Sequence, residues 1–390
     1  MTQSTKNKIA ILTMSAVLMS PVAISTILAK VRELFPDVSL SGVQLVMTMA
    51  TLASLIAVLL SGRLVYYMSK KNMILISLLM MAAGGMIGLL LHQSIATLYL
   101  AGIVFGFGQG IILTTSSALI TDYFTNGERN AMMGRQSAVL NIAGSALLLL
   151  AGWLSAVNWY YVYLVYLLGI PLFLIVKALL PKGEKLTVQK GEKVKILNPT
   201  VIYYCLVIFV FSITQYTYAT NISLLLENTE LGTSAMSGVA NACITAASFL
   251  SGMLMGGIIK VFKKYTFTFG IFCIVAGLLL SAWAPSLLAV LAGGAFVGLA
   301  IGSSTPSGLL AVAAAVPSAG ATGAIAAFSA ASTFGLFCSP LVINFLTSLV
   351  GGVSEQSRCL VAAVLAAALM LFTILYEARK PSDTGKVSAE

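Results

Sequence analysis

The sequence predicts an all-α integral membrane protein with twelve transmembrane helices in two six-helix bundles. Three observations support this fold class. First, the 390 residues are 59% hydrophobic and only 9% charged, whereas soluble domains carry about 25% charged residues. Second, apolar segments of the length that crosses a bilayer, about 20 residues, recur along the whole chain. Third, a pattern of glycines in the first half returns in the second half.

The expected spans follow from the apolar segments in order. They are residues 9–30, 43–65, 73–91, 97–120, 132–156, 159–180, 200–226, 237–260, 265–284, 286–314, 320–349 and 356–377. An even number of spans places both termini on the same side of the membrane. The first apolar segment is too long for a cleaved secretory signal, so it is interpreted as the first span.

The basic residues indicate which side this is. The chain has 22 Lys and Arg and a net charge of +10. With twelve spans, all of these residues except Lys30, Arg32 and Arg358 fall on the side of the termini. Because basic residues favour the cytoplasmic side, both termini are expected to be cytoplasmic. The positive charge is therefore interpreted as an orientation signal, and no nucleic acid partner is expected.

The repeated glycines lie in the fourth and tenth expected spans. The first set is Gly102, Gly106 and Gly110, within GIVFGFGQG. The second set is Gly294, Gly298 and Gly302, within GAFVGLAIG. A phosphate-binding loop would need a strand before the glycines and a polar helix start after them. Glycines four residues apart share one helical face instead, and they let another helix backbone come close within a membrane.

The repeat divides the chain into two halves. Residues 1–180 are expected to form one six-helix bundle and residues 200–390 the other, and residues 181–199 read as a lysine-rich cytoplasmic linker. Lys70 and Lys71 in the first half match Lys263 and Lys264 in the second. Two such repeats, which rock around a shared central site, are a known transporter arrangement.

The residues that enzymes and metal sites need are missing from the expected spans. The single histidine, His92, falls in a short loop, and no metalloprotease motif, nucleophile elbow or pair of carboxylates occurs within a span. The five cysteines form no CxxC pattern. We expect no enzymatic activity, no cofactor and no metal site.

The chain resembles the major facilitator superfamily over nearly its whole length. The sequence GRLVYYMSKK at 62–71 is similar to the family's loop between helices 2 and 3, with Tyr66 in place of the usual aspartate. The Asp122-Tyr-Phe and Glu128-Arg129 sequences between helices 4 and 5, and Gly152-Trp153, are also similar. The resemblance implies the family's fold, alternating access, and a cavity lined mainly by helices 1, 4, 7 and 10.

Two departures from the family's pattern bear on the energy source. Gly106 stands where many members carry an arginine implicated in proton coupling. Gly144 is followed by Ser145, where drug antiporters of the family usually have proline. Without a carboxylate in mid-span, facilitated diffusion or coupling to a solute gradient is expected.

Polar residues inside the spans are the candidates for a substrate site, because unsatisfied polar groups are costly in lipid. The candidates are Thr48, Gln109, Asn141, Gln215, Tyr218, Asn241 and Thr245. The alternative is that these side chains simply join neighbouring helices. Strongly ionic solutes usually need countercharges in the spans, and these spans have almost none.

Charged residues at the span ends are candidates for gating. Those expected to adjust the inward and outward states are Lys30, Arg32, Lys70, Lys71, Asp122, Arg129 and Glu227. In the family, the outer ends of helices 1 and 7 approach each other, so Arg32 and Glu227 could pair across them. The alternatives are that Lys30 and Arg32 anchor a helix at lipid headgroups, and that Asp122 and Arg129 belong to a solvated helix end.

The predicted function is secondary transport of a small neutral, amphiphilic or weakly charged organic solute by alternating access. A proton-coupled multidrug efflux antiporter is the alternative within transport. A membrane receptor or scaffold that moves no solute is the alternative from another class. The protein is expected to be a monomer with the lipid bilayer and a small-molecule solute as its partners, in a bacterial inner or plasma membrane.

Overall fold

A computed structural model of the chain describes residues 2–124, 126–181, 198–284 and 286–379. Every regular element among these residues is helical. The first half contains α1 (Gln3–Ser15), η1 (Ser20–Ile27), α2 (Leu28–Leu34), α3 (Leu40–Tyr67), α4 (Lys70–Leu90), α5 (Ile95–Tyr123), α6 (Asn126–Val157), η2 (Trp159–Leu168) and α7 (Gly169–Leu179). The second half contains α8 (Pro199–Asn228), α9 (Ser234–Met253), α10 (Met255–Phe262), η3 (Lys263–Tyr265), α11 (Thr266–Ala282), α12 (Leu287–Ala314), α13 (Ser318–Leu349) and α14 (Glu355–Arg379). Most of the expected linker, residues 182–197, lies outside the described residues.

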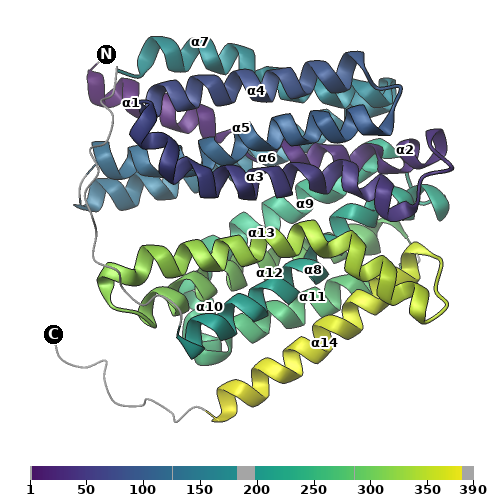
Figure 1. The fold of residues 1–390 in the computed structure, drawn as a ribbon. Helices are drawn as coiled ribbons and strands as arrows, with labels where there is room; N and C mark the ends of the chain where they lie inside the picture. Colours follow the sequence, from purple (N-terminus) through teal and green to yellow (C-terminus); the bar gives the residue numbers. More distant parts are fainter. Residues whose placement is uncertain (1, 125, 182–197, 285, 380–390) are drawn as a thin grey trace.

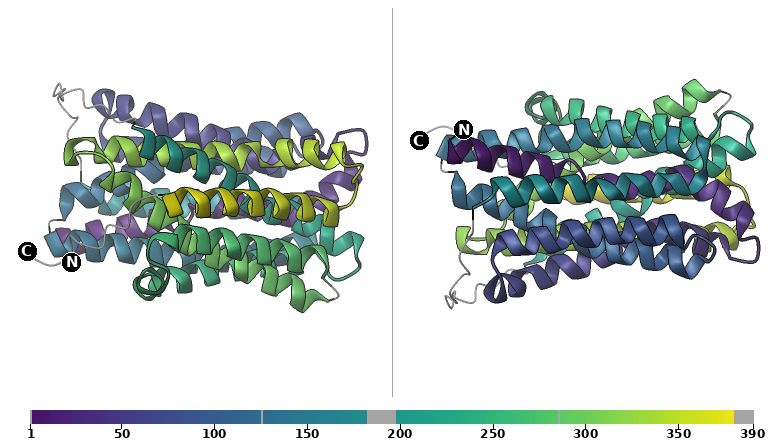
Figure 2. Two further views of the ribbon diagram at one scale, coloured as in Figure 1. Left: turned by 90° about the horizontal axis from the view of Figure 1, so that it is seen from below. Right: turned by 90° about the horizontal axis from the view of Figure 1, so that it is seen from above.

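Each half of the chain has its own hydrophobic core. The first core is built mainly from α1 to α7 and includes the buried rings of Phe105 and Tyr166, which stack at 3.8 Å between centroids. The second is built from α8 to α14 around Phe211 and Phe328. The two groups of helices lie side by side with their axes roughly along one direction (Figures 1 and 2). We call the end at which α1 begins and α14 ends the terminal end, and the opposite end the far end.

The two glycine patterns bring helix backbones together as expected. A Cβ at Gly102 would lie 3.3 Å from the carbonyl oxygen of Val46 on α3, and Cβ atoms at Gly106 and Gly110 would overlap the next carbonyls along α3. On α12, Cβ atoms at Gly298 and Gly302 would overlap carbonyls of α9. The helix-packing interpretation is confirmed: α5 lies against α3, and α12 lies against α9 in the same manner.

Eleven segments of the described chain are long and apolar enough to cross a membrane, and α9 is a twelfth long helix. The expected span 237–260 differs from the structure. Its helix ends at Met253, and a short helix, α10, follows to Phe262. α9 carries polar residues at Ser237, Asn241, Thr245 and Ser248. Three of these four residues line the cavity described below.

The first span also differs from the continuous helix expected over residues 9–30. α1 ends at Ser15, and the chain continues as a 3₁₀ helix that has Pro21 in its first turn. Hydroxyls of Ser20, Ser25 and Thr26 each donate to the carbonyl three residues earlier, which suits 3₁₀ geometry. Proline cannot donate a main-chain hydrogen bond, so a break before Pro21 is the physical consequence.

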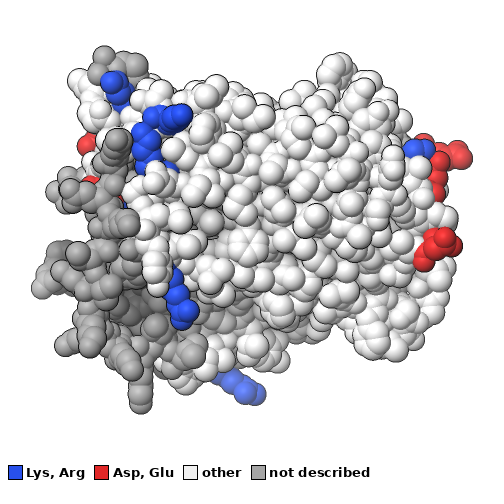
Figure 3. Space-filling view, turned by 45° about the horizontal axis from the view of Figure 1, so that its top comes forward, with Lys and Arg blue, Asp and Glu red and all other residues white. Residues whose placement is uncertain are grey.

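The surface is divided into charged ends and an uncharged middle. Figure 3 shows most of the visible Lys and Arg toward one end and most of the visible acidic side chains at the other, with a broad belt without charges between them. Large apolar side chains are exposed, such as Leu59 at 65% and Leu288 at 75%. Exposed apolar surface on this scale requires lipid, so the protein is a multi-pass membrane protein.

Candidate functional site

A cavity of about 270 Å³ lies where the two halves meet. The first half contributes three lining residues, from the start of η1 and from α6, and the second half contributes the remainder. The lining residues are Met19, Val22, Asn141, Gln215, Tyr216, Ala219, Asn241, Ile244, Thr245, Ser248, Val297, Ile301, Thr305, Ser332 and Leu336. The cavity therefore depends on the arrangement of both halves.

The lining combines apolar side chains with neutral polar ones. None of the lining residues is Asp, Glu, Lys, Arg or His. An ionic solute in such a cavity would lose hydration without gaining a countercharge, which is costly at membrane depth. The arrangement suits a solute that carries no full charge.

Asn241 on α9 is the most deeply buried polar side chain of the cavity, with 1% of its surface exposed. Its Nδ2 donates to Ser25 Oγ at 2.9 Å and to the carbonyl of Ser237 at 2.9 Å. Its Oδ1 is buried and has no hydrogen-bond partner among the described residues. Most buried side-chain polar atoms in proteins have a partner, so an unpaired amide oxygen here is unusual.

The other polar lining residues differ in whether their side chains have hydrogen-bond partners. Thr245 donates to the carbonyl of Asn241 at 3.2 Å, and Ser332 shares a hydrogen bond of 2.9 Å with Ser212. The amide of Gln215 on α8 is half-buried and makes no hydrogen bond to any described residue. Asn241 and Gln215 thus offer polar atoms that the protein itself does not use.

The cavity contains four of the seven substrate-site candidates that the sequence indicates. Asn141, Gln215, Asn241 and Thr245 meet there. They come from three different helices, which the sequence alone could not bring together.

The other three candidates do not line this cavity. The hydroxyl of Tyr218 donates to the carbonyl of Val290 at 2.7 Å, because the side chain faces α12 inside the second half. Gln109 donates at 2.7 Å to the carbonyl of Leu18, where helix 1 is interrupted. Thr48 is fully buried, and its Oγ1 has no partner among the described residues. A substrate contact of these three residues stays a prediction.

Several lining residues were not among the sequence candidates. Met19 and Val22 line the cavity because helix 1 is interrupted beside them, and Pro21 is the signal that could have indicated this. Thr305 precedes Pro306 in the interior of α12, which is a comparable signal. Tyr216 and Ser332 carry no sequence feature that separates them from other polar residues of the spans.

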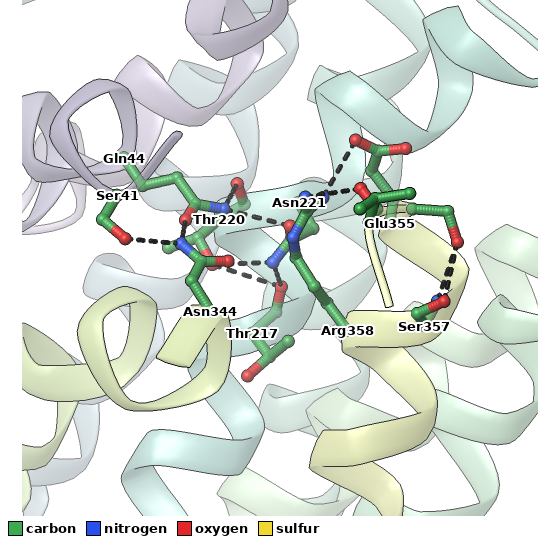
Figure 4. Close-up of polar contacts among 11 residues, drawn as sticks. Ser41, Gln44, Thr217, Thr220, Asn221, Asn344, Glu355, Ser357 and Arg358 are labelled. Carbon is green, nitrogen blue, oxygen red and sulfur yellow. Dashed lines mark hydrogen bonds and ion pairs between the residues drawn. The ribbon is translucent and has the colours of Figure 1, made fainter. Parts of the chain in front are cut away.

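Hydrogen bonds join the two halves near the far end, as Figure 4 shows. The Nε2 of Gln44 on α3 donates to the carbonyl of Thr220 and to Oδ1 of Asn221 on α8, both at 3.0 Å. The Nδ2 of Asn344 on α13 donates to Oε1 of Gln44 at 2.6 Å and to Ser41 at 3.0 Å. These bonds are made between neutral amides, hydroxyls and carbonyls.

Close backbone contact adds to this junction between α6 and α9. A Cβ on Gly152 would lie 2.9 Å from the carbonyl oxygen of Ala235, and one on Gly238 would lie 2.6 Å from the carbonyl oxygen of Leu148. Only glycine fits between backbones that are this close. The two halves are therefore in direct contact between the cavity and the far end.

The charged gating candidates divide into two groups. At the terminal end, Lys70 at the start of α4 forms an ion pair with Asp122 at the end of α5, and Lys71 donates to the carbonyls of Lys177 and Leu180. Lys264 makes the matching contact in the second half, to the carbonyl of Glu377 at 2.9 Å. The side chain of Arg129 lies outside the described part of the structure.

The far-end candidates Lys30 and Arg32 make local contacts. Lys30 pairs with Glu33 at 2.6 Å, one turn away. Arg32 donates to the carbonyls of Pro36 and Val38, in the loop that follows α2. Pairing of Arg32 with Glu227 stays a prediction.

Comparison with known proteins agrees with this architecture. The sequence profile described as Major Facilitator Superfamily matches residues 9–203 and 204–390, which together span almost the whole chain. No curated protein matches the sequence closely enough to be informative.

Solved structures of transporters share the fold. A variant of the nucleoside transporter NupG is 13% identical with a TM-score of 0.78, covering 96% of this chain and 99% of that one. An auto-inhibited peptide transporter of the POT family is 11% identical with a TM-score of 0.78, covering 98% and 99%. A bacterial homologue of the human lysosomal transporter Spinster, solved inward-facing, is 12% identical with a TM-score of 0.70, covering 96% and 95%. At such identities these similarities concern the fold, and the family itself rests on the profile. The chain is a member of the major facilitator superfamily.

Proposed function

We propose that the protein is a secondary transporter that moves a small neutral, amphiphilic or weakly charged organic solute by alternating access. The observation that carries the proposal is the cavity at the junction of the two halves, lined by apolar and uncharged polar residues. Transporters built from two repeats place their substrate site at the repeat interface.

The hydrogen bonds between the halves support an assignment of the conformational state. Gln44 and Asn344 join the halves near the far end, and Asn241 joins them at the wall of the cavity. If the lysine-rich terminal end is cytoplasmic, as the distribution of Lys and Arg suggests, this is a state closed to the outside. Outward opening then requires these bonds to break while others form at the terminal end.

One feature of the cavity favours a solute that is transported without protons over the proton-coupled efflux alternative. No lining residue is a carboxylate or histidine that could carry a proton with each cycle. We therefore propose facilitated diffusion or coupling to a solute gradient, in the cell membrane.

Uptake into proteoliposomes tests the proposal. The purified protein is reconstituted and offered radiolabelled nucleosides, sugars and dipeptides, because the solved relatives include nucleoside and peptide transporters. We expect saturable entry of at least one uncharged solute, and faster exchange when the same solute is present inside. Empty liposomes are the control. Absence of saturable entry across the panel would favour the receptor or scaffold.

A further inference from the structure

We propose that the cavity selects an uncharged solute that donates a hydrogen bond, and that Asn241 Oδ1 accepts it. This inference rests on the proposed transport function and gives its substrate a chemical class: a neutral molecule that has a hydroxyl or an N–H group beside an apolar portion. Asn241 is then a substrate-contacting residue that determines specificity.

The orientation of the Asn241 amide is fixed by its neighbours. The carbonyl of Ser237 can only accept, so the amide nitrogen must face it. The hydroxyl of Ser25 donates its own hydrogen to the carbonyl of Val22 at 2.6 Å, so Ser25 Oγ is also an acceptor for Asn241. With both amide hydrogens used, the remaining atom is the oxygen. The side chain therefore presents an acceptor, and exchanging the O and N positions would break both bonds.

This oxygen has the properties of a binding group. It is fully buried, its residue lines the cavity, and it has no partner among the described residues. Leaving a buried acceptor unpaired costs about 1–3 kcal/mol. A solute hydroxyl or N–H removes that cost on binding, whereas a solute without a donor leaves it in place. Sites with unpaired polar groups reject analogues that lack the matching hydrogen far more strongly than apolar sites do.

The remaining lining groups agree with this selectivity. Pro340 in α13 has no N–H, so the carbonyl of the lining residue Leu336 lacks its usual helical donor. The Gln215 amide can donate and accept, and so can turn toward either kind of group. Met19, Ile244 and Ile301 cover an apolar portion of the solute. The absence of charged lining residues disfavours anions and cations alike.

The test measures binding of two matched sets of probes to the purified full-length protein. One set is uridine, its fully O- and N-methylated derivative, and uridine 5′-monophosphate. The other is phenyl β-glucoside, its tetra-O-methyl ether and phenyl β-glucuronide. Within each set the first compound is neutral with donors, the second neutral without donors, and the third anionic. Dissociation constants come from isothermal calorimetry in detergent.

The decisive quantity is the ratio of dissociation constants between the methylated and the donor-bearing compound. For the wild-type protein we expect the donor-bearing compound of at least one set to bind about tenfold or more tightly than its methylated partner. The anionic compound should bind no better than the methylated one. In Asn241→Leu, which keeps the branching and the number of side-chain heavy atoms of asparagine, the ratio should fall to about one.

Thr26→Val is the matched control. It removes a buried hydroxyl that donates to the carbonyl of Ala23, one residue from Ser25 on the same 3₁₀ helix, and leaves the Asn241 amide and both of its hydrogen bonds in place. The ratio should therefore stay near the wild-type value even if overall affinity changes. Asn241→Ala repeats the measurement if Asn241→Leu does not fold. An equal loss of selectivity in Thr26→Val would mean that loosening of this helix explains the effect, and the proposal would be wrong.

Other outcomes separate the inference from the transport function. Equal binding of methylated and donor-bearing compounds, preferred binding of the anions, or no binding by either donor-bearing probe overturns the inference. Saturable proteoliposome flux of a charged or donor-free solute would also overturn it and leave the transporter standing. Donor-dependent binding without saturable flux of the bound probe would retain the site and contradict transport.

Discussion

The amide nitrogen of Asn344 on α13 donates to Oε1 of Gln44 on α3 at 2.6 Å, although the two residues are 300 positions apart. Gln44 in turn donates to the carbonyl of Thr220 and to Asn221 on α8. One glutamine is thus held by two helices of the other half. The far-end junction consists of directional bonds, which are lost together when the halves separate.

Removing this glutamine should favour the state that is open at the far end. Gln44→Ala deletes the hydrogen bonds to α8 and α13, each worth about 0.5–1.5 kcal/mol. In a poised two-state equilibrium the three bonds together shift populations about tenfold or more. The reporter is a cysteine at Val22 in a cysteine-free background, labelled from the far side by a membrane-impermeant maleimide. We expect faster labelling by a similar factor.

Tyr99→Phe is the control for this experiment. The Tyr99 hydroxyl donates to the carbonyl of Gly42 at 2.7 Å, near the same end but within the first half. Its loss should leave the labelling rate within about twofold of the parent protein, since no bond between the halves is broken. Equal acceleration in both variants would indicate general loosening of the far end and would contradict a specific role for Gln44.

The glycine contact between α6 and α9 gives a second, independent prediction. In Gly238→Val the side chain would press against the carbonyl of Leu148, and overpacking of this kind costs about 1–3 kcal/mol. Because the steric overlap exists only when the halves are in contact, the rate of labelling of the Val22→Cys reporter from the far end should rise at least about fivefold. Gly252→Val, at a site where a Cβ meets nothing within 4 Å, is the matched control and should label at the parent rate.

The sequence predicted features that depend on small, regularly spaced residues. The positions of Gly106 and Gly298 indicated close helix contacts, and both lie against carbonyls of a neighbouring helix. Asn241 and Gln215 were identifiable because polar side chains are rare in apolar spans, and both line the cavity. Met19 could not be identified from the sequence, because an apolar residue that lines a cavity looks the same in sequence as one that faces lipid or the core.

The far-end junction shows why contacts between particular residues are harder to predict from sequence than the presence of polar residues in a span. The pairing of the charged residues Arg32 and Glu227 stays a prediction, and the bonds observed for Arg32 are to nearby carbonyls. Gln44 and Asn344 make the observed contact, and nothing in a single sequence connects residues so far apart. A substrate contact of Tyr218 stays a prediction, and its hydroxyl donates to a carbonyl on another helix in this structure.

The Lys70–Asp122 ion pair should contribute modestly to stability. Lys70 is 13% exposed and Asp122 is 43% exposed, so solvent screening limits the pair to about 0.2–1 kcal/mol. Lys70→Gln and Asp122→Asn should each lower the melting temperature of the purified protein by about 1–3 °C, and the double variant by less than the sum. Lys6→Gln, at a lysine without a described ion pair, is the control. Additive effects would show that the two side chains do not interact.

The last prediction concerns the energy source. No carboxylate or histidine lines the cavity, so no group there can pick up and release a proton as the two halves rock. A solute that shows saturable entry into proteoliposomes should equilibrate to equal concentrations inside and outside. Imposing a pH difference of one unit in either direction should leave that final level unchanged, while a gradient of a second transported solute should drive exchange. Accumulation of the solute above the external concentration with a pH gradient alone, abolished by a protonophore, would contradict this prediction. The carboxylates at the span ends, Asp122 first, would then be the groups to substitute.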